Sequence, residues 1–390
     1  MRTALTVTAR VLIALLSATV LATAGYSWAT LKRVRESVTT TDVINVLSDV
    51  PNAPPAMDGA TDILLVGSDS RTDAQGRPLP ANVLRQLRTE ASDGVNTDTI
   101  IVLRIPHDGS KASAISIPRD TYVPIPDYQD DKINAAYGVT KLKTMQRLQS
   151  EGVNDLAERE KQGDQAGRRA LVRVVQELTG VRVDHYAEIN LYGFYLMTEV
   201  IGGVEVCLNE GTSDPNSGAN FRAGQQRVSG GDALAFVRQR NLPGGDLGRI
   251  KRQQVFMSAA VSELLSAGTF TDQGKLNGLL DAVNKSIVVD EGLDLATLAQ
   301  QAQGLAGGHF EFATIPVVDT NARNGRGQSI VTVDVDQVKA FVSQLLGPTM
   351  VPVTPPPSTP VATPQRLLGG PVVGLDGARR TTQLDVPCVD

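Results

Sequence analysis

The chain has very few of the residues from which nucleophilic and zinc-dependent active sites are built. It contains three histidines and two cysteines among 390 residues. His107, His185 and His309 fall in a predicted turn, strand and loop and share no spacing, which argues against a nucleophilic triad. The chain also has no GxSxG, Walker A or HExxH sequence, so enzymes built on those motifs are excluded.

An excess of positive charge is also missing. Lys and Arg number 37 against 42 Asp and Glu, which makes the formal net charge -5. Domains that bind nucleic acid usually carry a strongly basic surface, so we expect no nucleic-acid partner. The hydrophobic share of 41% is that of a globular protein with a core, and 390 residues allow one large or two ordinary domains.

The two cysteines lie too far apart in the sequence to form a metal-binding pair. In an oxidising compartment two cysteines usually pair. We therefore predict a disulfide between Cys207 and Cys388, which would fasten the C-terminal tail to a predicted strand at 204–208. Two free buried thiols are the alternative.

One long uncharged segment lies near the N-terminus. Residues 11–29 carry no charge and are long enough to cross a bilayer, which needs about 20 apolar residues. Trp28 lies at the outer end, where interfacial aromatic residues gather. We expect a cytoplasmic stub at 1–10, a single-pass signal anchor at 11–30 in the cytoplasmic (cell) membrane, and an extracytoplasmic remainder. A cleavable signal peptide is the alternative.

The pattern of apolar residues predicts a mixed α/β domain. An apolar run at 62–67 ends at a glycine and predicts a strand, and the segments 99–105 and 111–117 predict a hairpin. Helical spacing predicts helices at 168–180, 191–203, 247–266 and 336–346. We expect a mixed central β-sheet flanked by α-helices, arranged as a linker at 31–59, a catalytic domain at 60–348 and a Pro-rich C-terminal tail at 349–390.

Arginines are concentrated in one segment, FVRQRNLPGGDLGRIKRQQ at 236–254. A guanidinium group is planar and always charged, and it matches phosphate oxygens two at a time. Asp246 is expected to cap the helix at 247–266, whose N-terminus would also attract an anion. A solvated charged loop is the alternative. The members of this segment that we take as candidates for a phosphate site are Arg238, Arg240, Arg249, Arg252 and Gln253.

Polar side chains also gather at the ends of the predicted strands, where open α/β sheets usually build their sites. A polar insertion at 71–96 separates the first strand from the hairpin. Carboxylates together with a pyrophosphate are typical ligands of Mg²⁺, which takes one or two carboxylates from the protein. Phosphoryl transfer fits this composition because it needs positioning, a metal and cationic donors. The residues at the strand ends are Asp69, Arg71, Asp98, Arg119 and Asp120, with Lys132 further along.

The order of these motifs resembles the LytR–CpsA–Psr family of the bacterial envelope. The resemblance covers about residues 60–350 and rests on ILLVGSDSR, NTDTIIVLRI, AISIPRDTYVPIP, KINAAYG, GGDALAFVRQR and DLGRIKRQQ. It implies an extracytoplasmic phosphotransferase that moves a glycopolymer from a polyprenyl-pyrophosphate carrier to peptidoglycan and leaves a phosphodiester. The forms VRQR and LPGGDLGRI resemble the actinobacterial branch, in which the polymer would be arabinogalactan.

The resemblance also implies roles for the residues at the matching positions. Asp69 and Asp98 would hold Mg²⁺ (or Mn²⁺) on the pyrophosphate. Asp246 and Asp120 are the candidate general bases. Asn96 departs from the pattern, since many members have arginine there. Binding to phosphates and to the rest of the substrate would fall to Arg71, Arg119, Lys132, Arg238, Arg240, Arg249, Arg252 and Gln253.

Two other functions are compatible with the same residues. A pyrophosphatase of lipid carriers would use water in place of a sugar hydroxyl as the nucleophile. A non-catalytic envelope regulator would bind the lipid-linked glycan without turning it over. The sequence does not separate these alternatives from a transferase.

Overall fold

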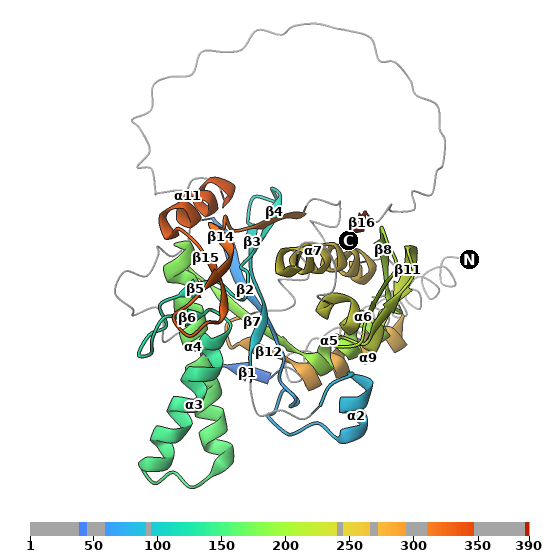
Figure 1. Ribbon diagram of the computed structural model, residues 1–390. Helices are drawn as coiled ribbons and strands as arrows, with labels where there is room; N and C mark the ends of the chain where they lie inside the picture. Colours follow the sequence, from blue (N-terminus) through green and yellow to red (C-terminus); the bar gives the residue numbers. More distant parts are fainter. Residues whose placement is uncertain are drawn as a thin grey trace, which may run out of the picture.

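The computed structural model describes residues 39–44, 59–90, 95–239, 245–265, 272–293, 310–346 and 387–389. A seven-stranded sheet lies at its centre, in the order β1-β12-β7-β2-β3-β4-β13 (Figure 1). The consecutive strands β2, β3 and β4 are antiparallel, whereas β7 runs parallel to β2 and β13 parallel to β4. The predicted mixed sheet is therefore confirmed. Its strands are β1 (Thr39–Thr41), β2 (Ala60–Ser68), β3 (Thr97–Pro106), β4 (Ala112–Ser116), β7 (His185–Asn190), β12 (Ile287–Asp290) and β13 (Phe310–Thr314).

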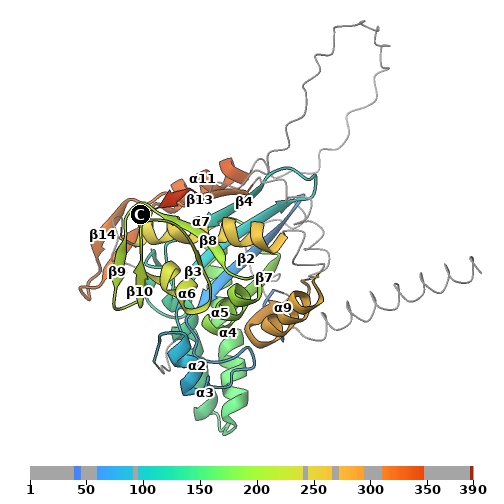
Figure 2. The ribbon, with the colours of Figure 1, turned by 90° about the vertical axis from the view of Figure 1, so that its right-hand side faces the viewer.

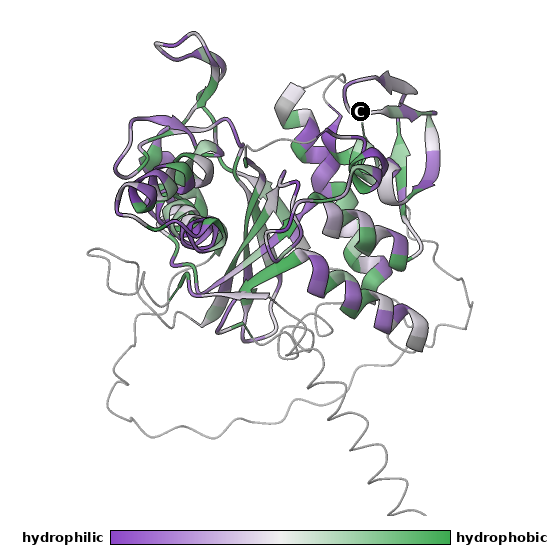
Figure 3. Cartoon of the chain, turned by 90° about the horizontal axis from the view of Figure 1, so that it is seen from below, coloured by the Kyte–Doolittle hydropathy of each residue, from purple (hydrophilic) through white to green (hydrophobic). Residues whose placement is uncertain are grey.

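Helices cover both faces of the sheet, as Figures 1 and 3 show. One layer consists of α3 (Ala135–Ser150), α4 (Leu156–Thr179) and α11 (Val335–Leu346). The other consists of α5 (Leu191–Val200), α6 (Gly230–Arg238), α7 (Gly245–Leu265) and α9 (Gln273–Ser286). No helix in the described ranges is long and apolar enough to cross a membrane, and the expected anchor at 11–30 lies outside those ranges.

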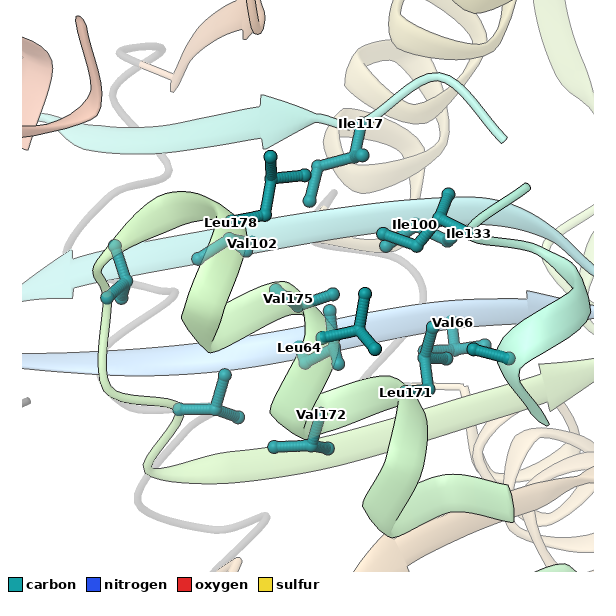
Figure 4. Packing of buried hydrophobic residues seen from close by; sticks show 14 of the residues in the cluster. Leu64, Val66, Ile100, Val102, Ile117, Ile133, Leu171, Val172, Val175 and Leu178 are labelled. Carbon is teal, nitrogen blue, oxygen red and sulfur yellow. The ribbon is translucent and has the colours of Figure 1, made fainter. Parts of the chain in front are cut away.

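The main core lies between the sheet and α4 (Figure 4). Alternate strand residues point to one face of a sheet, and residues three or four apart share one face of a helix. Leu64 on β2 and Val102 on β3 accordingly meet Leu171 and Val175 of α4, and all four are fully buried. Burial of each such side chain contributes about 1.5–3 kcal/mol, so this layer fixes the sheet on which the strand ends are displayed.

Helix α4 is longer than predicted, because it begins at Leu156 and not near residue 168, and α3, which packs against it, was not among the predicted helices. Glycines in the first half of α4 hid the helix, since glycine is a poor helix former. Here they permit close packing: a Cβ on Gly163 would lie 2.9 Å from Met145, and one on Gly167 would lie 2.7 Å from the carbonyl oxygen of Tyr137. The glycines are contact points between two helices.

A polar network joins these helices to β7. Arg168 Nε lies 2.8 Å from Glu188 Oε2, and the Tyr186 hydroxyl donates to the same oxygen at 3.0 Å. The Tyr137 hydroxyl donates to Asp164 at 2.7 Å. Burial raises the pKa of Tyr137 and of Tyr186 well above 10.0, so both phenols remain neutral hydrogen-bond donors. Each buried charge therefore has a partner.

The segment between β2 and β3 contains a helix, α2 (Ala81–Gln86), where the sequence predicted a polar insertion. Leu79, Leu84 and Leu87 are buried in a small core with Leu191 of α5 and Leu234 of α6. Figure 2 shows α2 beside α5 and α6. The prediction of a polar insertion was therefore wrong. The pattern was missed because the three leucines are spread over nine residues and form no periodic run.

A second, three-stranded sheet, β11-β8-β16, packs beside α7. Its strands are β8 (Val204–Leu208), β11 (Gly224–Val228) and β16 (Cys388–Val389). Cys388 is the register partner of Cys207, and the two are joined in a disulfide with Cα atoms 4.3 Å apart. The structure thus contains the predicted bond, and it shows in addition that the tail adds a strand to β8.

One ion pair makes the stability of the sheet depend on pH. His185 Nδ1 lies 3.1 Å from Asp290 Oδ2, across the β7–β12 contact. This hydrogen bond, helped by the negative charge, raises the pKa of His185 above its ordinary value of 6.5, although partial burial acts in the opposite direction. The stabilisation is therefore fully present below 6.5 and is lost as the pH rises through the raised pKa of the folded state.

We predict that His185→Gln lowers the free energy of unfolding by about 1–2 kcal/mol at acidic pH and removes this pH dependence. Urea unfolding at several pH values on both sides of 6.5 would measure it. His107→Gln is the matched control, because among the described hydrogen bonds the His107 side chain contacts only the Thr61 hydroxyl, near the surface. Equal pH dependence in the wild type and His185→Gln would contradict the assignment.

Candidate functional site

Asp69 and Asp98 both lie at a β-bulge, where β2 ends and β3 begins. Gly67 pairs with Thr99 and Ser68 pairs with Thr97, so Asp98 is the extra residue. Bulges next to active sites commonly re-aim a side chain. A Cβ on Gly67 would lie 3.0 Å from the Cβ of Thr99, so glycine at this position allows the two strands to approach closely.

Asp69 is held by neighbours on both of its carboxylate oxygens. The Asn96 amide donates to Oδ1 at 2.7 Å, and Arg71 Nη1 lies 3.1 Å from Oδ2. Arg71 Nη1 also donates to the Asp69 carbonyl oxygen, and Arg71 Nη2 donates to the Thr89 hydroxyl at 3.1 Å. Asn96, the departure from the family pattern, therefore contributes a backbone contact, while Arg71 supplies a guanidinium group at the same place.

A chain of alternating charges continues from Asp98. Arg119 Nη1 lies 2.7 Å from Asp98 Oδ1, and Arg119 Nε lies 3.8 Å from Asp120 Oδ2. Lys132 Nζ lies 2.8 Å from the other oxygen of Asp120. The Arg119 side chain is only 9% exposed, and a charge buried to this extent needs such partners. Four residues predicted from three separate motifs thus form one cluster.

The loop that carries Arg119 and Asp120 is fixed by its backbone. The Asn134 amide donates to the Arg119 carbonyl oxygen at 3.2 Å, and the Val331 amide donates to that of Asp120 at 2.8 Å. Lys132 belongs to the short strand β6 (Asp131–Lys132), which pairs with β5 (Tyr122–Val123). The loop after β4 is therefore held between two other segments, which is the rigidity that a site needs.

The arginines of the second motif lie where α6 meets α7. Arg238 is the last residue of α6, and its Nη1 donates to the Leu87 carbonyl oxygen at 3.2 Å. Arg252 is fully buried and donates to the Gln239 carbonyl oxygen at 2.5 Å, while Gln253 donates to that of Val237 at 3.2 Å. In the described contacts Arg252 and Gln253 thus hold the end of α6 that carries Arg238.

Two members of this motif are only partly placed. Arg240 lies outside the described residues. The helix α7 begins at Gly245, so Asp246 is its second residue and not the predicted cap. Arg249 is one turn further along α7 and is 2% exposed. Asp246 and Arg249 are therefore both in the first turn and a half of the helix.

Gln254, which the sequence analysis did not single out, ties α7 to the sheet. Its Nε2 donates to the Ser116 hydroxyl at 3.0 Å and to the Thr314 hydroxyl at 3.2 Å, at the ends of β4 and β13. Ser116 precedes Arg119 by three residues. This contact brings α7 to the same edge of the sheet as the charged cluster. The only signal in the sequence was a second glutamine next to Gln253.

The edge can bind an anion but offers no nucleophilic triad among the described residues. His107 follows the last residue of β3 and His185 begins β7, so both lie toward the opposite end of the sheet from Asp69. The groups gathered at the site are carboxylates and guanidinium groups. Such a set suits a phosphate or pyrophosphate with a divalent cation.

Among the described residues no three His, Cys, Asp or Glu side chains lie close enough together to hold a metal ion by themselves. Asp69 and Asp98 nevertheless supply oxygens from neighbouring strands at the bulge. Their side chains are 21% and 35% exposed, so solvent reaches both. This donor set fits a hard cation such as Mg²⁺, which takes one or two carboxylates and fills its other positions with water and substrate phosphate.

The chain is similar in sequence to two curated bacterial proteins. The chain is 52% identical over 293 residues to the cell wall biosynthesis protein LcpA of Corynebacterium glutamicum, covering 75% of this chain and 57% of that protein. It is 30% identical over 274 residues to the polyisoprenyl-teichoic acid–peptidoglycan teichoic acid transferase TagU of Oceanobacillus iheyensis, covering 70% and 69%. The chain thus spans less than two thirds of the length of LcpA.

Solved structures share the fold. The LytR-Csp2A-Psr enzyme from Actinomyces oris superposes with a TM-score of 0.52 at 19% identity, covering 79% of this chain and 95% of that one. B. subtilis TagV superposes with a TM-score of 0.53 at 19% identity, covering 74% and 98%. The LytR_cpsA_psr family model matches residues 26–345, which is most of the chain. From this match and the similarity to LcpA, the protein belongs to the LytR–CpsA–Psr family.

Proposed function

We propose that the protein transfers a glycopolymer from a polyprenyl-pyrophosphate carrier to peptidoglycan and forms a phosphodiester link. The observation that carries the proposal is the alternating cluster Asp98–Arg119–Asp120–Lys132 at the edge of the sheet. The relative from O. iheyensis is named as a transferase of polyisoprenyl-linked teichoic acid to peptidoglycan, and LcpA as a cell wall biosynthesis protein. The first of these names agrees with an anionic lipid-linked donor.

The proposed reaction exchanges two groups on one phosphorus atom: the acceptor hydroxyl enters and polyprenyl phosphate leaves. The hydroxyl of the acceptor sugar attacks the phosphorus on the glycan side, the bond from this phosphorus to the bridging oxygen breaks, and polyprenyl phosphate leaves with the electron pair. The phosphate oxygens would be bound, as charge develops on them, by Arg71, Arg119, Arg238 and Arg249. Arg240 is assigned to the same task on sequence grounds.

The hydroxyl proton needs an acceptor. Asp120 is engaged by Arg119 on one side and Lys132 on the other, which is the geometry of a group that positions the arginine. Asp246, in the first turn of α7, is therefore the preferred general base in this proposal. Asp120 is the second choice.

Asp69 and Asp98 would hold Mg²⁺ or Mn²⁺ in this scheme, with the pyrophosphate as a further ligand. The cation would supply positive charge next to the phosphate oxygens. Arg71 and Asn96 orient Asp69, and Arg119 orients Asp98, so the protein fixes both carboxylates before a cation arrives.

The polymer and the cellular location are further parts of this proposal. We assign arabinogalactan as the polymer, supported by 52% identity to a wall-biosynthesis protein of a corynebacterium. The location would be the cell membrane, with residues 11–30 as a single-pass anchor and the catalytic domain outside the cytoplasm. Cys207 and Cys388 form a disulfide, which suits an oxidising compartment.

The first prediction concerns the arginines. Arg238→Ala and Arg240→Ala should each lower the rate of transfer by about tenfold or more, because each loses charge-assisted hydrogen bonds worth about 1.5–3 kcal/mol. Arg→Lys at either position should also be poor, since an ammonium group cannot form the two-pronged contact. The assay is transfer of a labelled glycan from a polyprenyl-pyrophosphate donor to peptidoglycan.

Arg147→Ala serves as the control for the loss of one positive charge, because Arg147 lies on α3 and pairs with the exposed Glu151. Thermal unfolding would verify that each variant is folded. Near-normal transfer by Arg240→Ala would refute the role of that residue. Release of free glycan phosphate without acceptor, at the rate of transfer, would favour the pyrophosphatase alternative.

The second prediction concerns the cation. Chelation should remove the activity, Mg²⁺ or Mn²⁺ should restore it, and Asp98→Asn should raise the cation concentration needed for half-maximal transfer by about tenfold. Asp281→Asn is the control, since Asp281 pairs with Lys285 on exposed α9. An unchanged cation requirement in Asp98→Asn would exclude this residue as a ligand, and full activity in chelator would exclude the cation altogether.

A further inference from the structure

Two arginines that we assign to the phosphates are each held by the same short turn. Arg71 Nη2 donates to the Thr89 hydroxyl at 3.1 Å, and Arg238 Nη1 donates to the Leu87 carbonyl oxygen at 3.2 Å. Arg71 comes from the end of β2 and Arg238 from the end of α6. The residue between their two partners is Arg88. Whatever fixes this turn therefore fixes one contact of each guanidinium group, and Arg71 is held in addition by Asp69.

Arg88 itself has an unfavourable backbone conformation. Its φ is 51°, in the left-handed region where a residue other than glycine or asparagine is uncommon. Conformations of this kind persist where the surroundings hold them, and they gather at functional sites. The turn closes α2, since the Thr89 amide donates to the Leu84 carbonyl oxygen at 3.0 Å. A glycine would satisfy this turn without strain, so the side chain of Arg88 must supply something else.

The side chain of Arg88 contacts two other segments, at Asp232 and at Gly218, and we call these two contacts the clamp. Its Nη2 lies 2.5 Å from Asp232 Oδ1 in the first turn of α6, and its Nη1 donates to the Gly218 carbonyl oxygen at 2.5 Å. Gly218 and Gly231 leave the space for it. A Cβ on Gly218 would lie 2.6 Å from Arg88 Cδ, and a Cβ on Gly231 would lie 2.8 Å from the Gln86 carbonyl oxygen. The two glycines therefore let the end of α2 pack closely, because a side chain at either position would collide with it.

The clamp lies at the surface and so contributes little to global stability. The side chains of Arg88 and Asp232 are 38% and 57% exposed, and exposed ion pairs are worth little in unfolding experiments. The small core of Leu84, Leu87 and Leu234 already attaches α2 to α6. What the clamp adds is orientation of the turn against the helix that ends in Arg238.

We infer that Arg88 is a positioning residue for the phosphate-binding arginines Arg71 and Arg238, acting through the turn Leu87–Thr89 and its clamp to Asp232 and Gly218. This inference rests on the proposed function, because it takes the two arginines to bind the pyrophosphate. Arg88 does not touch the substrate in this scheme. Its removal would loosen the contact that each guanidinium group makes with the turn, while the contacts of Arg71 with Asp69 and the fold remain.

The test uses Arg88→Gly, which keeps the left-handed turn free of strain and removes only the side chain. We expect transfer at low donor concentration to fall about tenfold, as for loss of one well-placed charged hydrogen bond, with an unchanged melting temperature. Arg85→Ala is the matched control, because Arg85 is an exposed arginine on the same helix. It should behave as the wild type. Asp232→Asn should reproduce part of the Arg88→Gly defect.

A double-mutant cycle separates positioning from a general structural role. In an Arg238→Ala background, Arg88→Gly should cost clearly less than in the wild type, because one of the groups that it positions is gone. Full additivity, or wild-type transfer by Arg88→Gly, would overturn the inference while leaving the proposed function intact. A wild-type protein that transfers no glycan would overturn the proposed function, and this inference with it.

Discussion

Guanidinium groups buried at one end of a β-sheet impose a constraint on the architecture around them. Arg119, Arg249 and Arg252 are all less than 10% exposed, and a buried charge without a partner is strongly destabilising. Their partners must therefore be brought to the same edge, by loops and helices that are distant in sequence. The bulge at Asp98, the loop of Asp120 and the end of α6 all arrive there. The same residues that surround the candidate site therefore also serve as partners for the buried arginines.

The same rule operates on the inner side of the sheet with a different result. Arg168 and Glu188 pair between α4 and β7, and the hydroxyl of Tyr186 completes the contact. In this network the phenols stay neutral, and the charge of Arg168 is balanced by that of Glu188. At the edge, by contrast, Asp69 and Asp98 remain partly open to solvent. The difference between a structural network and a candidate site lies in this access to solvent.

Local patterns in the sequence predicted the strands and the residues at their ends, because apolar runs and the polar residues that end them are properties of neighbouring positions. They did not predict the first half of α4, whose glycines became intelligible only with α3 packed against them. They also missed Gln254 and Arg88, since each matters through partners more than 50 residues away. The predicted N-cap of α7 was also wrong: Asp246 was expected to precede the helix, but α7 begins at Gly245.

The disulfide also changes how the chain is connected covalently. Cys207 and Cys388 are separated by 181 positions, and the bond turns everything between them into a covalent ring. Helix α6, helix α7 and strands β12 and β13 all belong to that ring, whereas Asp69, Asp98 and Arg119 lie outside it. A single backbone cut inside the ring would leave both pieces attached, and reduction would then release the piece that runs to the C-terminus. The two halves of the arginine site would thus stay tethered in a nicked molecule for as long as its surroundings remained oxidising.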